Sequence, residues 1–141
     1  MAVSVLATQD LHYLLNLTGK KETLVDAVDE GLDVTAFERV AENLDITEKR
    51  LAELLRINTS TLARRKRSGS LSVDESERLY RVAFLLERST QVMGSLEAAQ
   101  RWLREGKRAL GGESPLVYAR TEPGAREVED LLGRIEYGIP S

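Results

Sequence analysis

The spacing of apolar residues is the feature that most constrains the fold of this chain. Along most of its 141 residues, apolar side chains recur three and four positions apart, and alternation of β-branched residues is scarce. A period of 3.6 residues places such side chains on one face of a helix, whereas a strand needs a period of two. The pattern predicts an all-α protein whose helices end at glycines such as Gly19, Gly31 and Gly69.

Composition excludes several classes of chemistry. The chain has no cysteine, which rules out disulfides, thiolate metal sites and cysteine nucleophiles. It has one histidine, His12, so one chain cannot build a histidine metal cluster. No nucleophile elbow or phosphate-binding loop occurs, and Gly111-Gly112 is expected to form a turn. We therefore expect a protein that is not an enzyme, with no catalytic residues, metal or cofactor.

The sequence also carries no targeting or membrane signal. No apolar run is long enough to cross a bilayer, and the N-terminus lacks a charged region followed by an apolar one. We expect a cytoplasmic protein that does not bind membranes.

Charge is unevenly distributed. The formal net charge is −3, of which residues 1–33 carry −4 and residues 94–141 carry −1, while residues 34–93 carry +2. The positive excess comes from four adjacent cations, Arg64-Arg65-Lys66-Arg67. An acidic total argues against indiscriminate binding to polyanions but leaves room for one focused site.

The same patterns divide the chain into three parts. Residues 1–33 form an N-terminal helical segment, with one short helix ending at Gly19 and another from Lys21 to Glu30. Residues 34–93 form a DNA-binding module, and 94–141 form a small helical domain. Helix-capping residues are expected at Thr35, Thr47, Asn58 or Thr59, Ser72, Ser95 and Ser114, and the last helix is expected to begin at Thr121.

The middle part has the helix spacing of a helix-turn-helix. Thr47 caps a short helix that ends near Arg56, and a second short helix follows at about residues 60–67. Two short helices joined by a tight turn and packed on a longer helix are a common DNA-binding arrangement. A solvated helix end would also explain the cations, but the helix spacing and the Ser/Thr-rich start favour DNA.

Helix geometry gives these residues separate roles. With Leu62 facing the core, a rotation of about 100° per residue points Arg64 outward, where it can contact a guanine. The hydroxyl-rich start of the helix can bind a phosphate. Arg65 and Lys66 fall on the flanks of the helix, where they can reach the phosphate backbone of DNA. Lys66 and Arg67 mostly position the helix on the duplex. The predicted DNA-binding residues are Thr59, Ser60, Thr61, Arg64, Arg65, Lys66 and Arg67. Because +2 is a small charge for a monomer, we expect a homodimer on two half-sites.

Two stretches resemble the Xre/MbcA/ParS family of type II antitoxins, over roughly Gly31 to the C-terminus. The first is INTSTLARRKRSGSLSVDESERLYRVAFLLE at 57–87, and the second, more specific one is AAQRWLREGKRALGGESPLVYARTEPGAREVEDLLGRIEYGIPS at 98–141. Its matching residues in order are Trp102-Leu103, Ala109-Leu110-Gly111-Gly112, Pro115-Leu116, Thr121-Glu122, Gly124-Ala125, Val128, Leu132-Gly133-Arg134-Ile135 and Tyr137-Gly138.

The resemblance implies a division of labour. The helix-turn-helix would bind the promoter DNA of its own operon as a repressor, and the C-terminal domain would neutralise a RES-domain toxin that consumes NAD⁺ by hydrolysis or ADP-ribosyl transfer. It also implies that residues near the C-terminus cover the active site of the toxin. Those residues are Arg134, Glu136, Tyr137, Gly138, Ile139, Pro140 and Ser141.

Two other functions fit the same residues. One is a helix-turn-helix regulator whose C-terminal domain serves only dimerisation or effector binding. The other is a protein-interaction module whose basic helix does not bind DNA. A RES-type toxin gene beside this one would separate the antitoxin from both, and salt-dependent promoter binding would separate the last from the other two.

Overall fold

The helical periodicity of the sequence is realised in the structure, which confirms the all-α prediction. The computed structural model describes residues 10–17 and 23–138, and no strand occurs within those two ranges. None of the helices described there is long and apolar enough to cross a membrane. The elements are α2 (Leu11–Leu14), α3 (Leu24–Glu30), α4 (Val34–Leu44), α5 (Glu48–Leu54), α6 (Thr59–Ser68), α7 (Val73–Met93), α8 (Leu96–Arg104), the 3₁₀ turn η1 (Arg108–Leu110), α9 (Pro115–Tyr118) and α10 (Glu122–Glu136).

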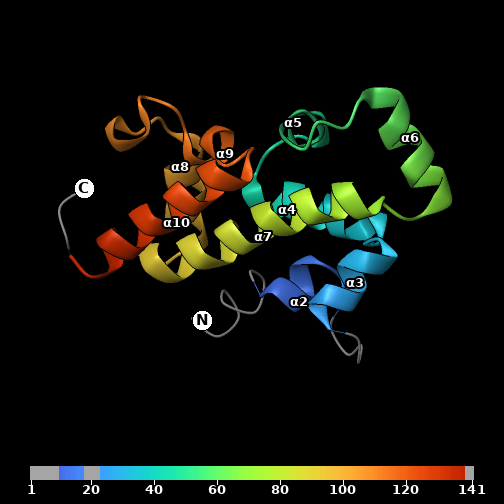
Figure 1. Ribbon diagram of the computed structural model, residues 1–141, viewed down its shortest axis with the longest axis horizontal. Helices are drawn as coiled ribbons and strands as arrows, with labels where there is room; N and C mark the ends of the chain where they lie inside the picture. The colour runs from blue at the N-terminus through green and yellow to red at the C-terminus, as the bar shows by residue number, and fades with distance from the viewer. Residues whose placement is uncertain (1–9, 18–22, 139–141) are drawn as a thin grey trace.

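Helix α7 is the element around which the others pack. Its N-terminal part contacts α3 and α4, and its C-terminal part contacts α8 and α10 (Figure 1). Leu79 and Leu86 of α7 are fully buried, as are Phe37 of α4 and Leu132 of α10. Burial of each such side chain stabilises the fold by about 1.5–3 kcal/mol. One continuous core therefore extends from the N-terminal helices into the C-terminal domain.

Most helices begin where local sequence predicts. At each confirmed N-cap the side chain accepts a hydrogen bond from the N–H group three residues later, which satisfies a donor that the helix leaves open. Ser72 and Glu75 form the reciprocal capping box at the start of α7. The confirmed caps are Thr47, Asn58, Ser72, Ser95 and Ser114, and Thr121, where the last helix was expected to begin, caps α10 in the same way.

The predicted cap at Thr35 is wrong. Helix α4 begins two residues earlier, because the Asp33 carboxylate accepts a hydrogen bond from the Thr35 N–H group at 2.8 Å and caps the helix. The first predicted helix is also too long, since α2 ends at Leu14 and Asn16 adopts a left-handed conformation with φ of 61°. Gly19 lies outside the described residues.

Helix α3 starts later than predicted. It begins at Leu24 after a cap at Thr23, and Lys21 lies outside the described residues. Its end at Gly31 is confirmed.

The loop after α6 is fixed to the segment before α4. The Leu71 N–H group donates to the Leu32 carbonyl at 2.9 Å, and the Val34 N–H group donates to the Gly69 carbonyl at 2.9 Å. The buried Ser76 hydroxyl accepts from the Leu32 N–H group at 2.8 Å. These bonds hold the two connections that flank the helix-turn-helix, and so they fix where α6 leaves the body of the protein.

Candidate functional site

Helix α6 carries the basic stretch and projects from one end of the molecule (Figure 1). The Asn58 side chain accepts hydrogen bonds from the Thr61 N–H group at 2.8 Å and from the Ser60 hydroxyl at 2.9 Å, which starts the helix. Gly69 ends it in the left-handed region, with φ of 94°. Leu62 is partly buried against the core, as predicted, but no residue of α6 is fully buried.

The outward side of α6 contains five of the seven residues predicted to bind DNA. Thr59, Ser60, Arg64 and Arg67 are exposed, and Thr61 is partly exposed. The Arg64 guanidinium donates to the Thr61 hydroxyl at 3.3 Å, so it lies along the helix start. The structure therefore brings two cations, three hydroxyls and the N-terminus of a ten-residue helix to one exposed surface.

Arg65 lies differently from its neighbours. Its Nε donates to Glu75 Oε1 at 2.8 Å and its Nη2 donates to Glu75 Oε2 at 3.1 Å. Burial by itself raises the pKa of the Glu75 carboxyl, but the bonds from Arg65 and from the Ser72 N–H group outweigh it, so the pKa lies below its ordinary value. The guanidinium thus joins α6 to α7.

Lys66 is also held by acidic side chains. Its Nζ lies 2.5 Å from Glu48 Oε1 of α5 and 3.3 Å from Glu38 Oε2 of α4. The bond to Glu48, with a smaller contribution from Glu38, raises the pKa of Lys66 although burial opposes it. All three side chains are about 40% exposed, so this cluster remains open to solvent.

The other predicted functional residues lie at the far end of α10. Glu136 ends the helix, Tyr137 follows it with 77% of its surface exposed, and Ile135 is 37% exposed. Arg134 is partly buried, and Gly138 has a φ of 72°. Ile139, Pro140 and Ser141 lie outside the described residues. Figure 1 shows this end of α10 and α6 at opposite ends of the long axis.

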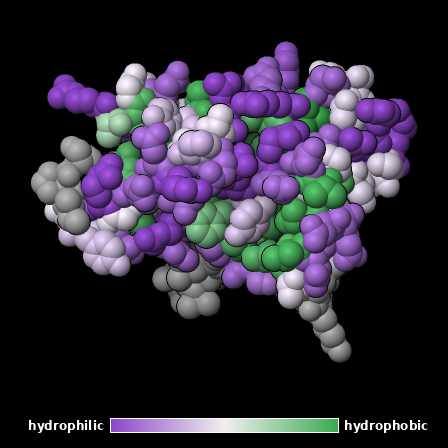
Figure 2. Space-filling view, in the orientation of Figure 1, coloured by the Kyte–Doolittle hydropathy of each residue, from purple (hydrophilic) through white to green (hydrophobic). Residues whose placement is uncertain are grey.

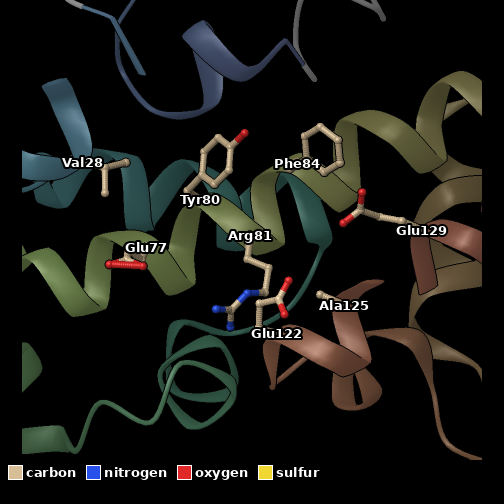
Figure 3. Close-up of a pocket in the computed structure, with 8 residues that line it drawn as sticks. All are labelled: Val28, Glu77, Tyr80, Arg81, Phe84, Glu122, Ala125 and Glu129. Carbon is tan, nitrogen blue, oxygen red and sulfur yellow. The ribbon is translucent and has the colours of Figure 1, made fainter. Parts of the chain in front are cut away.

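A groove that sequence reasoning missed runs between α3 and α10, with α7 as its floor. It has a volume of about 310 Å³, and Val28, Tyr80, Phe84 and Ala125 are its apolar lining residues. Its polar lining residues are Glu77, Arg81, Glu122 and Glu129 (Figure 3). Figure 2 shows hydrophobic side chains gathered on this face over α3 and the adjoining part of α7.

Acidic groups dominate the groove. Burial raises the pKa of the Glu129 carboxyl, and the neighbouring Asp130 and Glu122 raise it further. Within the described ranges, no group of three His, Cys, Asp or Glu side chains is arranged to hold a metal ion. In the sequence, this groove is indicated only by the spacing of Glu77, Tyr80 and Phe84, which places them along one side of α7.

The architecture defines a class of protein: a helix-turn-helix DNA-binding module continued into a second helical domain. Comparison with protein families gives the same division. The family model for the antitoxin Xre-like helix-turn-helix domain matches residues 23–83, and the model for the antitoxin Xre/MbcA/ParS C-terminal toxin-binding domain matches residues 76–138. Both matches include residues 76–83, which belong to α7.

Curated relatives support both assignments. The chain is 30% identical over 118 residues to antitoxin Xre of Yersinia enterocolitica, covering 82% of this chain and 80% of the relative. It is 29% identical to antitoxin Xre of Photorhabdus laumondii over 116 residues, 81% of this chain and 78% of the relative. It is 29% identical to antitoxin Xre of Pseudomonas putida over 111 residues, which cover 79% of this chain and 69% of the relative.

The chain belongs to the Xre antitoxin family, as the resemblance in its sequence predicted. It is an antitoxin with a helix-turn-helix module and a toxin-binding domain, and its partners are DNA and a toxin. The roles of individual residues, the three domain boundaries and the identity of the toxin stay predictions.

Proposed function

We propose that this antitoxin neutralises a RES-domain toxin that consumes NAD⁺, by covering the active site of the toxin with the end of α10 and the residues after it. The observation that carries the proposal is the exposure of Tyr137, which is 77% exposed directly after a 15-residue helix. A tyrosine has a large apolar ring and few rotamers, so it loses little entropy when a partner buries it.

The position of the helix end supports the same role. Glu136 is bonded to Arg88 of α7 at 2.5 and 3.2 Å, so the last turn of α10 is attached to the body of the protein. A tail that starts from a fixed point pays a smaller ordering cost when it enters a pocket. The proposed toxin-binding residues are Arg134, Glu136, Tyr137, Gly138, Ile139, Pro140 and Ser141.

The second part of the proposal is repression of the antitoxin's own operon. Two copies of the chain would form a dimer and place two α6 helices in the major groove of two half-sites. Arg64 would contact a guanine, and Arg67 with the hydroxyls of Thr59, Ser60 and Thr61 would bind phosphates. The antitoxin itself performs no catalysis in this proposal.

The test of toxin neutralisation uses the purified antitoxin and the RES-domain protein encoded beside it. We expect the antitoxin to stop NAD⁺ consumption at equimolar concentration, and removal of residues Tyr137–Ser141 to restore it while promoter binding persists. The control is Val25→Ala, which changes another apolar side chain, on α3, that is 70% exposed. A RES-domain enzyme that stays fully active at saturating antitoxin would refute this part of the proposal.

Repression is tested separately, by binding to the upstream promoter at several salt concentrations. We expect log K to fall linearly with log salt and Arg64→Ala to weaken operator binding by a factor of about 10–100, the range for one guanine contact. Light scattering should give the mass of a dimer. Promoter binding no tighter than binding to unrelated DNA would refute repression and leave toxin neutralisation standing.

A further inference from the structure

Helix α6 is not anchored mainly by hydrophobic burial. None of its ten residues is buried, and among the residues described Leu62 is its one apolar side chain partly buried against the core. Helix α5, the other short helix of the motif, buries Leu51, Ala52 and Leu54. Since packing density fixes the direction of most helices, the direction of α6 must depend more on its polar contacts.

The strongest of these contacts is the bond between Arg65 and Glu75. Two parallel N–H···O bonds, at 2.8 and 3.1 Å, fix the plane of the guanidinium against the carboxylate. The partner is itself rigid: Glu75 is 6% exposed, its Oε1 accepts from the Ser72 N–H group at 2.9 Å, and its own N–H group donates to the Ser72 hydroxyl. The capping box that starts α7 thus also holds the middle of α6.

The same contact makes Arg65 a poor phosphate ligand. A phosphate bonded to its guanidinium would approach the Glu75 carboxylate, and the two anions would repel one another at short range. Arg64 and Arg67 on either side are exposed. The adjacent arginines of this stretch therefore have two different roles: Arg64 and Arg67 are exposed to a ligand, whereas Arg65 is bonded within the protein.

We propose that Arg65 is a positioning residue, which acts through Glu75 to set the direction in which α6 presents Arg64 and Arg67 to DNA. The proposal rests on the DNA-binding function and removes Arg65 from the predicted set of phosphate contacts. It makes the N-terminus of α7 part of the recognition apparatus, although no residue there touches DNA.

Glu75→Gln separates positioning from phosphate binding by the sign of its effect. If Arg65 bound a phosphate, removal of the neighbouring negative charge would free its guanidinium and tighten binding to DNA. If Arg65 positions α6, the loss of the charged fork weakens operator binding, and we expect a factor of about 10, the lower end of the range for one charged hydrogen bond. Glutamine keeps an oxygen for the Ser72 N–H group, so the start of α7 is preserved.

Arg65→Lys gives a second, independent discrimination. Lysine keeps the positive charge that a phosphate needs, but it lacks the planar fork that matches a carboxylate. We expect Arg65→Lys to weaken operator binding about as much as Arg65→Ala. The matched control is Arg126→Lys on α10, where the arginine also pairs with a glutamate, Glu122 at 2.6 Å, but lies outside α6, and we expect operator binding close to that of the wild type.

A measurement without DNA tests the cause directly. The chain has no cysteine, so Ala63→Cys on α6 and Gln91→Cys on α7, both exposed, accept two spin labels without background. Double electron–electron resonance spectroscopy should give a narrow distribution of distances between the labels in the otherwise wild-type chain. The distribution should be broader when Glu75→Gln is added. Toxin inhibition by the same variants should be unchanged, which shows that the fold is intact.

The results distinguish failure of this inference from failure of the proposed function. Unchanged or tighter operator binding by Glu75→Gln, wild-type binding by Arg65→Lys, or an unchanged distance distribution would each overturn the positioning role of Arg65. Absence of promoter binding by the wild-type chain would overturn the repressor function itself. A broader distance distribution in that case would still show that the Arg65–Glu75 pair fixes α6.

Discussion

Arg88 of α7 and Glu136 at the end of α10 form a two-bond ion pair that attaches the last turn of α10 to the central helix. The bonds join Nη2 to Oε1 at 2.5 Å and Nη1 to Oε2 at 3.2 Å. Arg88 holds the pKa of the Glu136 carboxyl below its ordinary range, although burial opposes this. The pair therefore stays charged at neutral pH and fixes the position from which Tyr137 extends.

Arg88→Ala should weaken toxin neutralisation without affecting the binding of the antitoxin to DNA. With the ion pair lost, the last turn of α10 has more conformations to lose on binding, which costs about 0.5–1.5 kcal/mol, a factor of about 2–10 in the inhibition constant. Titration of the toxin with each variant measures this constant. Arg126→Ala is the matched control, because Arg126 pairs with Glu122 at 2.6 Å in the first turns of the same helix. Equal effects of the two substitutions would contradict a special role for the Arg88 pair.

Glu75 should give the protein a stabilisation that disappears in acid. Its folded-state pKa is lowered, so the stabilisation is fully present above the unfolded pKa of about 4.3 and is lost as the pH falls through the lower folded value. We expect Glu75→Gln to lower the free energy of unfolding at pH 7 by about 1–2 kcal/mol, the range for a charged hydrogen bond that is partly replaced. Urea unfolding from pH 7 to pH 3 should show the two proteins converging.

The control for this prediction is Glu53→Gln. Glu53 pairs with Arg50 at 3.3 Å on the surface of α5, with both side chains about half exposed. Exposed pairs contribute little, so this substitution should change the unfolding free energy by less than about 0.5 kcal/mol at any pH. A constant difference between Glu75→Gln and wild type down to pH 3 would show that the carboxylate charge is not the cause.

The local features of this fold could be predicted from the sequence because their causes lie within a few residues. Thr47, Ser72 and Thr121 cap helices through bonds to N–H groups three positions later, a pattern visible in the sequence itself. The prediction failed at Thr35 because Asp33 is another good cap two residues earlier. Periodicity alone does not decide between two capping residues that lie so close together.

The contacts between distant residues could not be predicted in this way. Arg65 belonged to the basic stretch and Glu75 to a capping box, and nothing in their spacing shows that the chain turns back to join them. The groove needs Val28, Tyr80 and Ala125 from three separate helices, so it exists only once α3 and α10 pack on α7. The outward direction of Arg64 was predictable, because helix geometry alone determines it once Leu62 faces the core.

Two glycines of α10 should respond in opposite directions to alanine. A Cβ atom at Gly124 would lie 1.9 Å from the Tyr118 carbonyl oxygen, whereas one at Gly133 would meet nothing within 4 Å. We expect Gly124→Ala to destabilise the protein by about 2 kcal/mol or more, because backbone must move to relieve the clash. Gly133→Ala should stabilise it by about 0.5–1 kcal/mol, since alanine is the better helix former. Thermal unfolding measures both, and similar melting temperatures for the two variants would be inconsistent with the close packing of α9 on α10.

Two serines of α7 that are both fully buried should differ in how much they stabilise the fold. The Ser76 hydroxyl accepts the hydrogen bond of the Leu32 N–H group at 2.8 Å, whereas the Ser89 hydroxyl donates to the Leu86 carbonyl of its own helix at 3.2 Å. Ser76→Ala leaves a buried donor without a partner and should cost about 1–3 kcal/mol. In Ser89→Ala the Leu86 carbonyl remains part of the backbone hydrogen bonding of α7, so this substitution should cost less than about 1 kcal/mol. Because both substitutions gain the same helix propensity, the difference between them in urea unfolding isolates the bond to Leu32.

The loss of stability in Ser76→Ala should also reach the loop that follows α6. Leu32 accepts a bond from Leu71, which lies in the loop directly after the recognition helix, so release of the Leu32 segment loosens that loop. Hydrogen exchange should therefore speed up at the amides of Val34 and Leu71 in Ser76→Ala and remain at the wild-type rate in Ser89→Ala. Equal protection of these amides in the two variants would mean that the loop after α6 is held by its own backbone bonds and does not depend on the Ser76 hydroxyl.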